Sequence, residues 1–117
     1  MSLQPDNVFL IPPRVHMTTT GRSFHLKPHQ RCGWPTSISV FLMSLAASVG
    51  SRAIAVILSG MAADGSDALG CIKAAGGRTF AQSGAVFDSM PQNAIDTGHV
   101  DYVFPASDIA ERIARMI

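Results

Sequence analysis

The chain has 117 residues, of which 47% are hydrophobic and 15% charged, and its formal net charge is +1. This length suits one small domain, and the composition excludes a largely disordered chain. Scattered basic residues and a near-zero charge provide no electrostatic footprint for nucleic acid, and no apolar stretch approaches the roughly 20 residues of a membrane span.

The N-terminus has no charged segment followed by an apolar run, so the sequence predicts no signal peptide. Cys32 and Cys71 lie far apart and form no C-x-x-C pair, which favours two reduced thiols over a disulfide or a redox motif. Together these features predict a cytoplasmic protein.

The first third of the chain has the pattern of β structure. A short apolar strand is predicted over 8–11, and Pro12 and Pro13 end it. Next, alternating residues on both sides of a turn at Gly21–Arg22 predict a β-hairpin. A polar loop rich in Gly and Pro then covers 28–35.

The rest of the chain alternates between helical and strand patterns. Helices are predicted over 36–49, 66–75, 91–97 and 108–117. Strands are predicted over 53–58, 78–82 and 100–104. Apolar strands that alternate with helices indicate an α/β fold, with a mostly parallel sheet and flanking helices, here preceded by the hairpin.

The glycine-rich loop Gly60–Gly65 joins a predicted strand to a predicted helix. Ligands in open α/β sheets sit at the carboxyl ends of strands, and a helix N-terminus offers N–H groups for an anion or an oxyanion. A P-loop is disfavoured, because no Lys follows Gly65 and Asp64 would repel a phosphate. On pattern alone Asp64 is a helix N-cap, with Asp67 three residues later at capping-box spacing.

The stretch Ile57-Leu58-Ser59-Gly60-Met61-Ala62-Ala63-Asp64-Gly65 resembles the signature of CheB-like chemotaxis protein-glutamate methylesterases, a strand followed by Thr/Ser-Gly-Met-Gly-x-Asp-Gly. Shorter matches follow in the same order: Ala74-Ala75-Gly76-Gly77, Phe80-Ala81-Gln82, Ser89-Met90-Pro91, Ala94-Ile95, Gly98 and Val100-Asp101. The resemblance implies a Rossmann-like methylesterase domain. Residues 1–117 would be its C-terminal portion, with the hairpin over 1–27 and α/β units over 36–117.

In that family the motif aspartate is the acid of a Ser-His-Asp triad, which implies this role for Asp64. The backbone amide of Met61 is the implied oxyanion donor. The implied activity is hydrolysis of glutamyl methyl esters, and deamidation of glutamines, on the cytoplasmic region of chemoreceptors. It needs neither a metal nor an organic cofactor.

The chain also departs from the family pattern. Ala62 replaces the usual glycine, and the acidic residue that the family often has around 35–39 is absent. The family's nucleophile loop and His-bearing segment lie upstream of everything present, and no Gly-x-Ser-x-Gly elbow occurs. We therefore expect the chain alone to be inactive and to need the N-terminal part of the catalytic domain as a partner. Whether the natural protein also has a receiver domain or is fused to a methyltransferase stays an open question.

The single serines and histidines do not replace the missing catalytic groups. Structural roles are expected for Ser59, Ser66, Ser83 and Ser89. Neither metal-ligand spacing nor a general-base role is indicated for His16, His25, His29 and His99.

Two other interpretations stay open. One is a non-enzymatic α/β binding module whose Gly60–Gly65 loop holds an anion or a partner peptide, and the other is a purely structural remnant. In addition, the sheet edge beside 53–58 would be open without the missing segment, so we expect the chain to self-associate.

Overall fold

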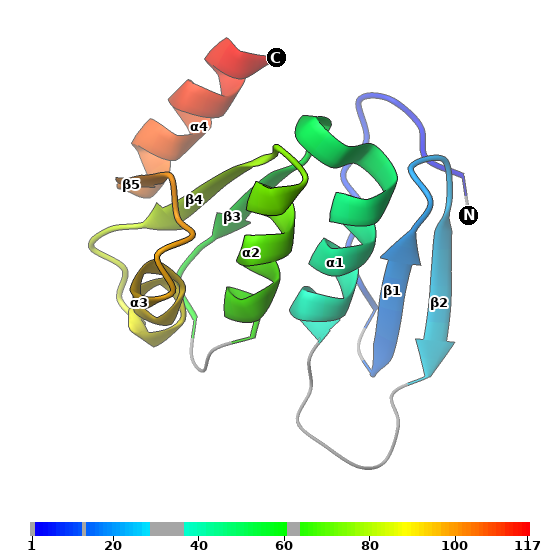
Figure 1. The fold of residues 1–117 in the computed structure, drawn as a ribbon, viewed down its shortest axis with the longest axis horizontal. Coiled ribbons are helices and arrows are strands. Elements are labelled where there is room, and N and C mark those ends of the chain that lie inside the picture. Colours follow the sequence, from blue (N-terminus) through cyan, green and yellow to red (C-terminus); the bar gives the residue numbers. More distant parts are fainter. Residues whose placement is uncertain (1, 13, 29–36, 61–63) are drawn as a thin grey trace.

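The computed structural model describes residues 2–12, 14–28, 37–60 and 64–117 (Figure 1). The elements in chain order are β1 Val15–Thr19, β2 Phe24–Pro28, α1 Ser37–Val49, the 3-10 turn η1 Gly50–Arg52, β3 Ile54–Ile57, α2 Ser66–Ala74, β4 Arg78–Gln82, α3 Ser89–Asp96, β5 Tyr102–Phe104 and α4 Ala106–Met116. A parallel sheet of β3, β4 and β5 lies among helices, and β1 and β2 form a separate antiparallel pair. The predicted α/β class is confirmed.

The hairpin packs on α1, on the side of that helix away from α2 (Figure 1). The backbone N–H of Thr19 donates to Ser44 Oγ at 3.0 Å, and Ser48 Oγ donates to the Thr19 carbonyl at 2.6 Å. Gly21 makes the turn with a φ of +86°, a conformation that glycine adopts without steric cost. Serines on α1 therefore fasten the hairpin by satisfying the polar groups of Thr19, which is buried.

The predicted strand at 8–11 is wrong, because these residues adopt no regular structure. Phe9 packs against Phe24, with 4.9 Å between the ring centroids, while Val8 and Leu10 are 91% and 86% exposed. A strand needs a neighbour for its backbone N–H and C=O groups, and none of the described strands pairs with this segment. High β propensity alone did not decide the structure.

The sheet has the strand order β3-β4-β5 with every pair parallel. Because the order follows the chain, α2 crosses from β3 to β4 and α3 from β4 to β5. Right-handed crossovers in one direction place both helices on the same face, and α2 and α3 contact each other. The strand β3 forms one outer edge of this sheet.

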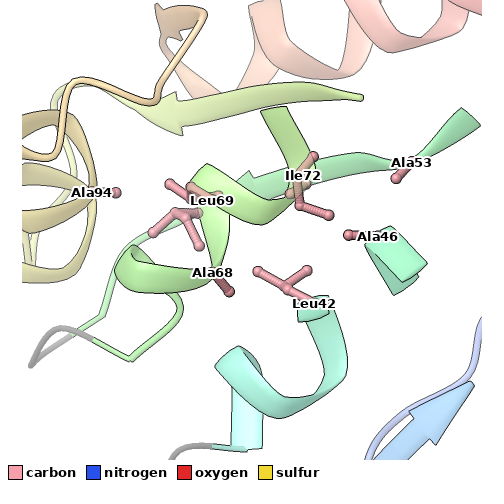
Figure 2. Close-up of a cluster of buried hydrophobic side chains, with 9 residues drawn as sticks. Leu42, Ala46, Ala53, Ala68, Leu69, Ile72 and Ala94 are labelled. Carbon is pink, nitrogen blue, oxygen red and sulfur yellow. The ribbon is translucent and has the colours of Figure 1, made fainter. Parts of the chain in front are cut away.

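The main core lies between α1, α2 and β3 (Figure 2). Leu42 and Ala46 of α1 point toward α2, whose Leu69 and Ile72 are fully buried. Much of this core consists of small side chains, which leave room for close packing between elements; these are Ala46, Ala53, Ala55, Ala68 and Ala94. This core fixes α1 against α2 and so determines where the first turn of α1 lies relative to the loop before α2.

The helix α4 covers the opposite face of the sheet. Phe80 is register partner of Val56 and Tyr102, so it points away from the face that bears Ala55. The rings of Phe80 and Tyr102 stack at 5.0 Å, and the guanidinium of Arg112 on α4 lies 5.8 Å from the Tyr102 centroid. Aromatic stacking and a cation–π contact thus join α4 to β4 and β5.

Several element boundaries differ from the predicted ones. The helices α3 and α4 each begin two residues earlier than predicted, at Ser89 and Ala106, and β5 begins two residues later, at Tyr102. Pro91 lies in the first turn of α3, where N–H groups have no partner within the helix, so a missing N–H costs nothing there. Proline therefore marked the first turn of the helix rather than its first residue.

Candidate functional site

The candidate site lies where the parallel strands end. The Ser59 N–H, just beyond β3, donates to the Gln82 side-chain Oε1 at 2.8 Å. The Gly60 N–H donates to the Phe87 carbonyl at 2.9 Å, and the Met90 N–H donates to the Gly60 carbonyl at 3.1 Å. The end of β3 is thereby tied to β4 and to the start of α3, so the chain leaves the strand in a defined direction.

Asp64 binds the N-terminus of α1 with its carboxylate. The backbone N–H of Ile38 donates to Asp64 Oδ2, and that of Ser39 donates to Oδ1, both at 3.1 Å. A carboxylate at a helix N-terminus is favoured by the helix dipole and satisfies N–H groups that have no partner within the helix. The side chain of Asp64 is half-buried, and its orientation is fixed by two donors from one helix.

The prediction that Asp64 caps the helix following it is wrong. The N-cap of α2 is Gly65, which has no side chain that could cap the helix. The carboxylate of Asp64 instead caps α1, which begins 27 residues earlier in the chain. A carboxylate offers about four acceptor positions, and the two α1 amides use two of them. These two contacts with the described residues leave other acceptor positions of the carboxylate, and a triad acid uses such a position to accept from its histidine.

The same contact bears on whether an anion could bind at the N-terminus of α1, a different place from the Gly60–Gly65 loop of the binding-module interpretation. The amides of Ile38 and Ser39 would be natural donors to a bound anion, but the Asp64 carboxylate already occupies them. An anion would have to displace a carboxylate that belongs to the chain. The arrangement therefore disfavours a phosphate or sulfate site at the N-terminus of α1.

Gly65 brings the loop directly against α1. Its φ of +93° is a conformation that favours glycine, and its N–H donates to Ser39 Oγ at 2.9 Å. A Cβ at this position would lie 2.7 Å from Ile38 Cγ2 and 3.2 Å from Ile57 Cδ1. The glycine that the sequence motif contains is thus required both by backbone conformation and by space.

The serines predicted to be structural behave in two ways. Ser59 Oγ accepts from the Phe87 N–H at 3.2 Å, and Ser89 Oγ lies 3.4 Å from the Gly60 carbonyl. These two side chains hold the end of β3, as expected for structural serines. Ser66, at the first residue of α2, is 5% exposed, and its hydroxyl has no hydrogen-bond partner within the described part of the chain.

Some residues singled out in the sequence cannot be placed. Met61, the expected oxyanion donor, lies outside the described residues, as do His29 and Cys32. His16 and His25 lie on the hairpin, and the ring of His99 faces Gly70 of α2, where a Cβ would lie 3.2 Å from His99 Nε2. The structure does not place these three histidines at the end of β3.

Asp101, which belongs to one of the shorter sequence matches, has a structural role because it binds residues of two elements. Its Oδ2 accepts from the Thr79 N–H at 3.0 Å, and its Oδ1 forms an ion pair with Lys73. Partial burial raises the pKa of this carboxyl, but the hydrogen bonds from Lys73 and Thr79 and the Lys73 charge outweigh it and hold the pKa below the ordinary 3.8. Asp101 therefore stays ionised and links α2 to β4.

Two contributors to the site were not predicted from the sequence. Ser39 and Gln82 both bind the loop region through their side chains, yet each is far from it in the sequence. Neither belongs to a spacing pattern with Asp64, because their contacts arise from the packing of separate elements. A serine in the first turn of a helix was the one local signal for Ser39.

Within the described residues, no three or more His, Cys, Asp or Glu side chains are grouped to hold a metal ion. None of the described helices has both the length and the apolar character to cross a membrane.

Comparison with known proteins gives consistent matches over nearly the whole chain. The family model described as CheB methylesterase matches residues 1–113. An uncharacterized 104.1 kDa protein of Rhodobacter capsulatus is 45% identical over 116 residues, which are 97% of this chain and 12% of that protein. A protein-glutamate methylesterase/protein-glutamine glutaminase of Rhizobium meliloti is 37% identical over 117 residues, 95% of this chain and 32% of the relative.

The fold comparison agrees. The crystal structure of the Thermotoga maritima CheB methylesterase catalytic domain superposes with a TM-score of 0.90 at 29% identity, covering 100% of this chain and 66% of that domain. The chain therefore spans about two thirds of the solved domain and about a third or less of these curated relatives.

Proposed function

The chain belongs to the CheB methylesterase family, and from this membership we propose that residues 1–117 form the C-terminal portion of a protein-glutamate methylesterase catalytic domain. The hairpin would occupy 1–27 and the α/β units 36–117. In this proposal the chain supplies the triad acid, Asp64, and the oxyanion donor, the Met61 amide. The serine nucleophile and the histidine base come from outside this chain.

The observation that carries the proposal is the orientation of Asp64. Both carboxylate oxygens are held by backbone amides of α1, and these two contacts with the described residues leave acceptor positions for a third donor. A triad acid needs this combination, because it must hold the imidazole in the correct tautomer and stabilise the imidazolium that forms. The adjoining end of β3 is also held firmly, which would direct the backbone that leads into Met61.

The proposed reaction is ester hydrolysis through an acyl-enzyme. The serine oxygen attacks the glutamyl carbonyl while the histidine takes its proton, and methanol leaves with that proton. Water then cleaves the acyl-enzyme to the free glutamate. Deamidation of glutamine follows the same steps with ammonia as the leaving group, and the chemistry calls for no metal or organic cofactor.

The partners follow from this assignment. We propose that the substrate is the cytoplasmic region of a methylated chemoreceptor and that the protein acts in the cytoplasm. The rest of the catalytic domain would be the first partner of this chain. Alone, the chain would have at most residual activity, since removal of a triad nucleophile or base costs on the order of 10⁶ in rate in one well-studied protease.

Methanol release from methylated receptor tests the assignment. The chain alone should release none above background. In the complete catalytic domain, Asp64→Asn should lower kcat by about 10⁴, whereas Asp67→Asn, an exposed carboxylate on the first turn of α2, should stay within a few fold. Two results would remove Asp64 from the triad. One is methanol release by the chain alone that persists after Asp64→Asn, and the other is a complete domain whose kcat does not change with that substitution.

We also propose that the isolated chain self-associates through β3. This strand is an outer strand of the described sheet, and Leu58 beyond it is 48% exposed. Open strand edges pair readily with another chain, and a net charge of +1 does little to oppose this. A dimer that pairs two β3 edges is the expected species. Light scattering over a range of concentrations measures it, and a strict monomer at high concentration would contradict it.

A further inference from the structure

The contact between Asp64–Gly65 and Ser39 runs in both directions. The Ser39 N–H donates to Asp64 Oδ1 at 3.1 Å, and the Gly65 N–H donates to Ser39 Oγ at 2.9 Å. One residue of α1 therefore binds the carboxylate of Asp64 with its backbone and the following peptide with its side chain. The two hydrogen bonds close a ring between segments 25 residues apart in the sequence.

This ring would be difficult to keep without the hydroxyl. Gly65 is buried, and its backbone lies against Ile38 and Ile57, so no water can readily replace Ser39 Oγ as acceptor for its N–H. A buried N–H without a partner is unfavourable, and the loop would relieve it by moving away from α1. Such a movement would also displace the carboxylate of Asp64 from the α1 amides.

Two serines further along α1, Ser44 and Ser48, serve a different neighbour. Ser44 Oγ accepts from the Thr19 N–H, and Ser48 Oγ donates to the Thr19 carbonyl, so both fasten the hairpin. The hydrogen bonds described above between α1 and Asp64–Gly65 come from the first turn of the helix, at Ile38 and Ser39. Ser39 and Ser44 therefore form a matched pair on one helix, with the same side chain bound to two different parts of the fold.

We propose that Ser39 is a positioning residue for the triad acid. Its hydroxyl holds the Asp64–Gly65 peptide against α1, and this hold directs the free acceptor positions of the Asp64 carboxylate toward the incoming histidine. The inference rests on the proposed function for its catalytic meaning, but the geometric part concerns this chain alone. Ser39 touches no reacting atom and acts through Asp64.

Amide hydrogen exchange in the chain itself tests the geometric part. Ser39→Ala should speed exchange of the Ile38 amide about tenfold, because Asp64 loses its fixed position as acceptor. Ser39→Thr, which keeps the hydroxyl, should restore protection, and Ser44→Ala should leave the Ile38 amide unchanged. Unchanged Ile38 protection in Ser39→Ala would overturn the proposal, since Asp64 would then dock without the hydroxyl.

Kinetics of the complete catalytic domain test the catalytic part. Ser39→Ala should lower kcat about tenfold with KM within twofold, Ser39→Thr should recover the rate, and Ser44→Ala should match the parent. If Asp64→Asn lowers kcat and Ser39→Ala does not, the positioning role is overturned while the proposed function stands. If Asp64→Asn leaves kcat intact, the proposed function fails, and the exchange experiment alone decides the Ser39 contact.

Discussion

Replacing Gly65 with alanine should reveal how closely the candidate loop is packed against α1. The new Cβ would lie 2.7 Å from Ile38 Cγ2 and 3.2 Å from Ile57 Cδ1, and the backbone would keep a φ of +93°. Placing a non-glycine residue at such a φ costs roughly 1–2 kcal/mol. Overpacking in a filled core adds about 1–3 kcal/mol. The expected loss is about 2–5 kcal/mol of the unfolding free energy, out of the roughly 5–15 kcal/mol typical of a domain.

Gly98→Ala is the matched control for this prediction. Gly98 has a φ of +79°, and a Cβ there would meet nothing within 4 Å. It therefore carries the backbone cost and the entropy gain of Gly→Ala without the collision. Urea unfolding followed by circular dichroism gives both free energies, provided that the denaturant slopes agree. If Gly65→Ala destabilised the chain no more than Gly98→Ala, within about 0.5 kcal/mol, the close contact between loop and α1 would be refuted.

Ser66→Ala should stabilise the chain by about 1 kcal/mol in the same urea assay, because it removes a buried hydroxyl that has no partner in the described structure. A loss of stability would mean that this hydroxyl does form a hydrogen bond. Asp101→Asn should lower stability at neutral pH. Because the folded pKa lies below the ordinary 3.8, the stabilisation from Asp101 is full above that value and is lost as the pH falls through the folded pKa. The stability gap between parent and variant, measured by urea unfolding from pH 7 to pH 2, should close below pH 3.8; a constant gap would contradict the ion pair as its source.

Local sequence patterns were sufficient to predict the elements whose contacts lie between residues close together in the sequence. The hairpin around Gly21 and the strand–loop–helix unit from β3 to α2 were predicted because alternation, helical spacing and glycines act within a few residues. The parallel sheet followed as well, since continuous apolar strands separated by helices leave few other arrangements. The family motif that contains Asp64 lies on this locally determined unit.

Tertiary packing decided the rest. The segment 8–11 has the composition of a strand but found no partner for its backbone, so half of its apolar side chains stay exposed. The guanidinium of Arg112 on α4 lies over the rings of Tyr102 and Phe104, a contact that the helical pattern of 108–117 did not predict. Both outcomes depend on which elements meet, and no local spacing encodes that.

The candidate site itself combines the two kinds of information. The sequence alone identified Asp64 and the glycine after it, because they belong to a contiguous motif. Their partners Ile38 and Ser39 became visible only in the folded chain, where packing between α1 and α2 brings the first turn of one helix to the loop before the other. A carboxylate binds whichever amides the fold places within about 3 Å, so the helix that Asp64 caps was decided by tertiary structure.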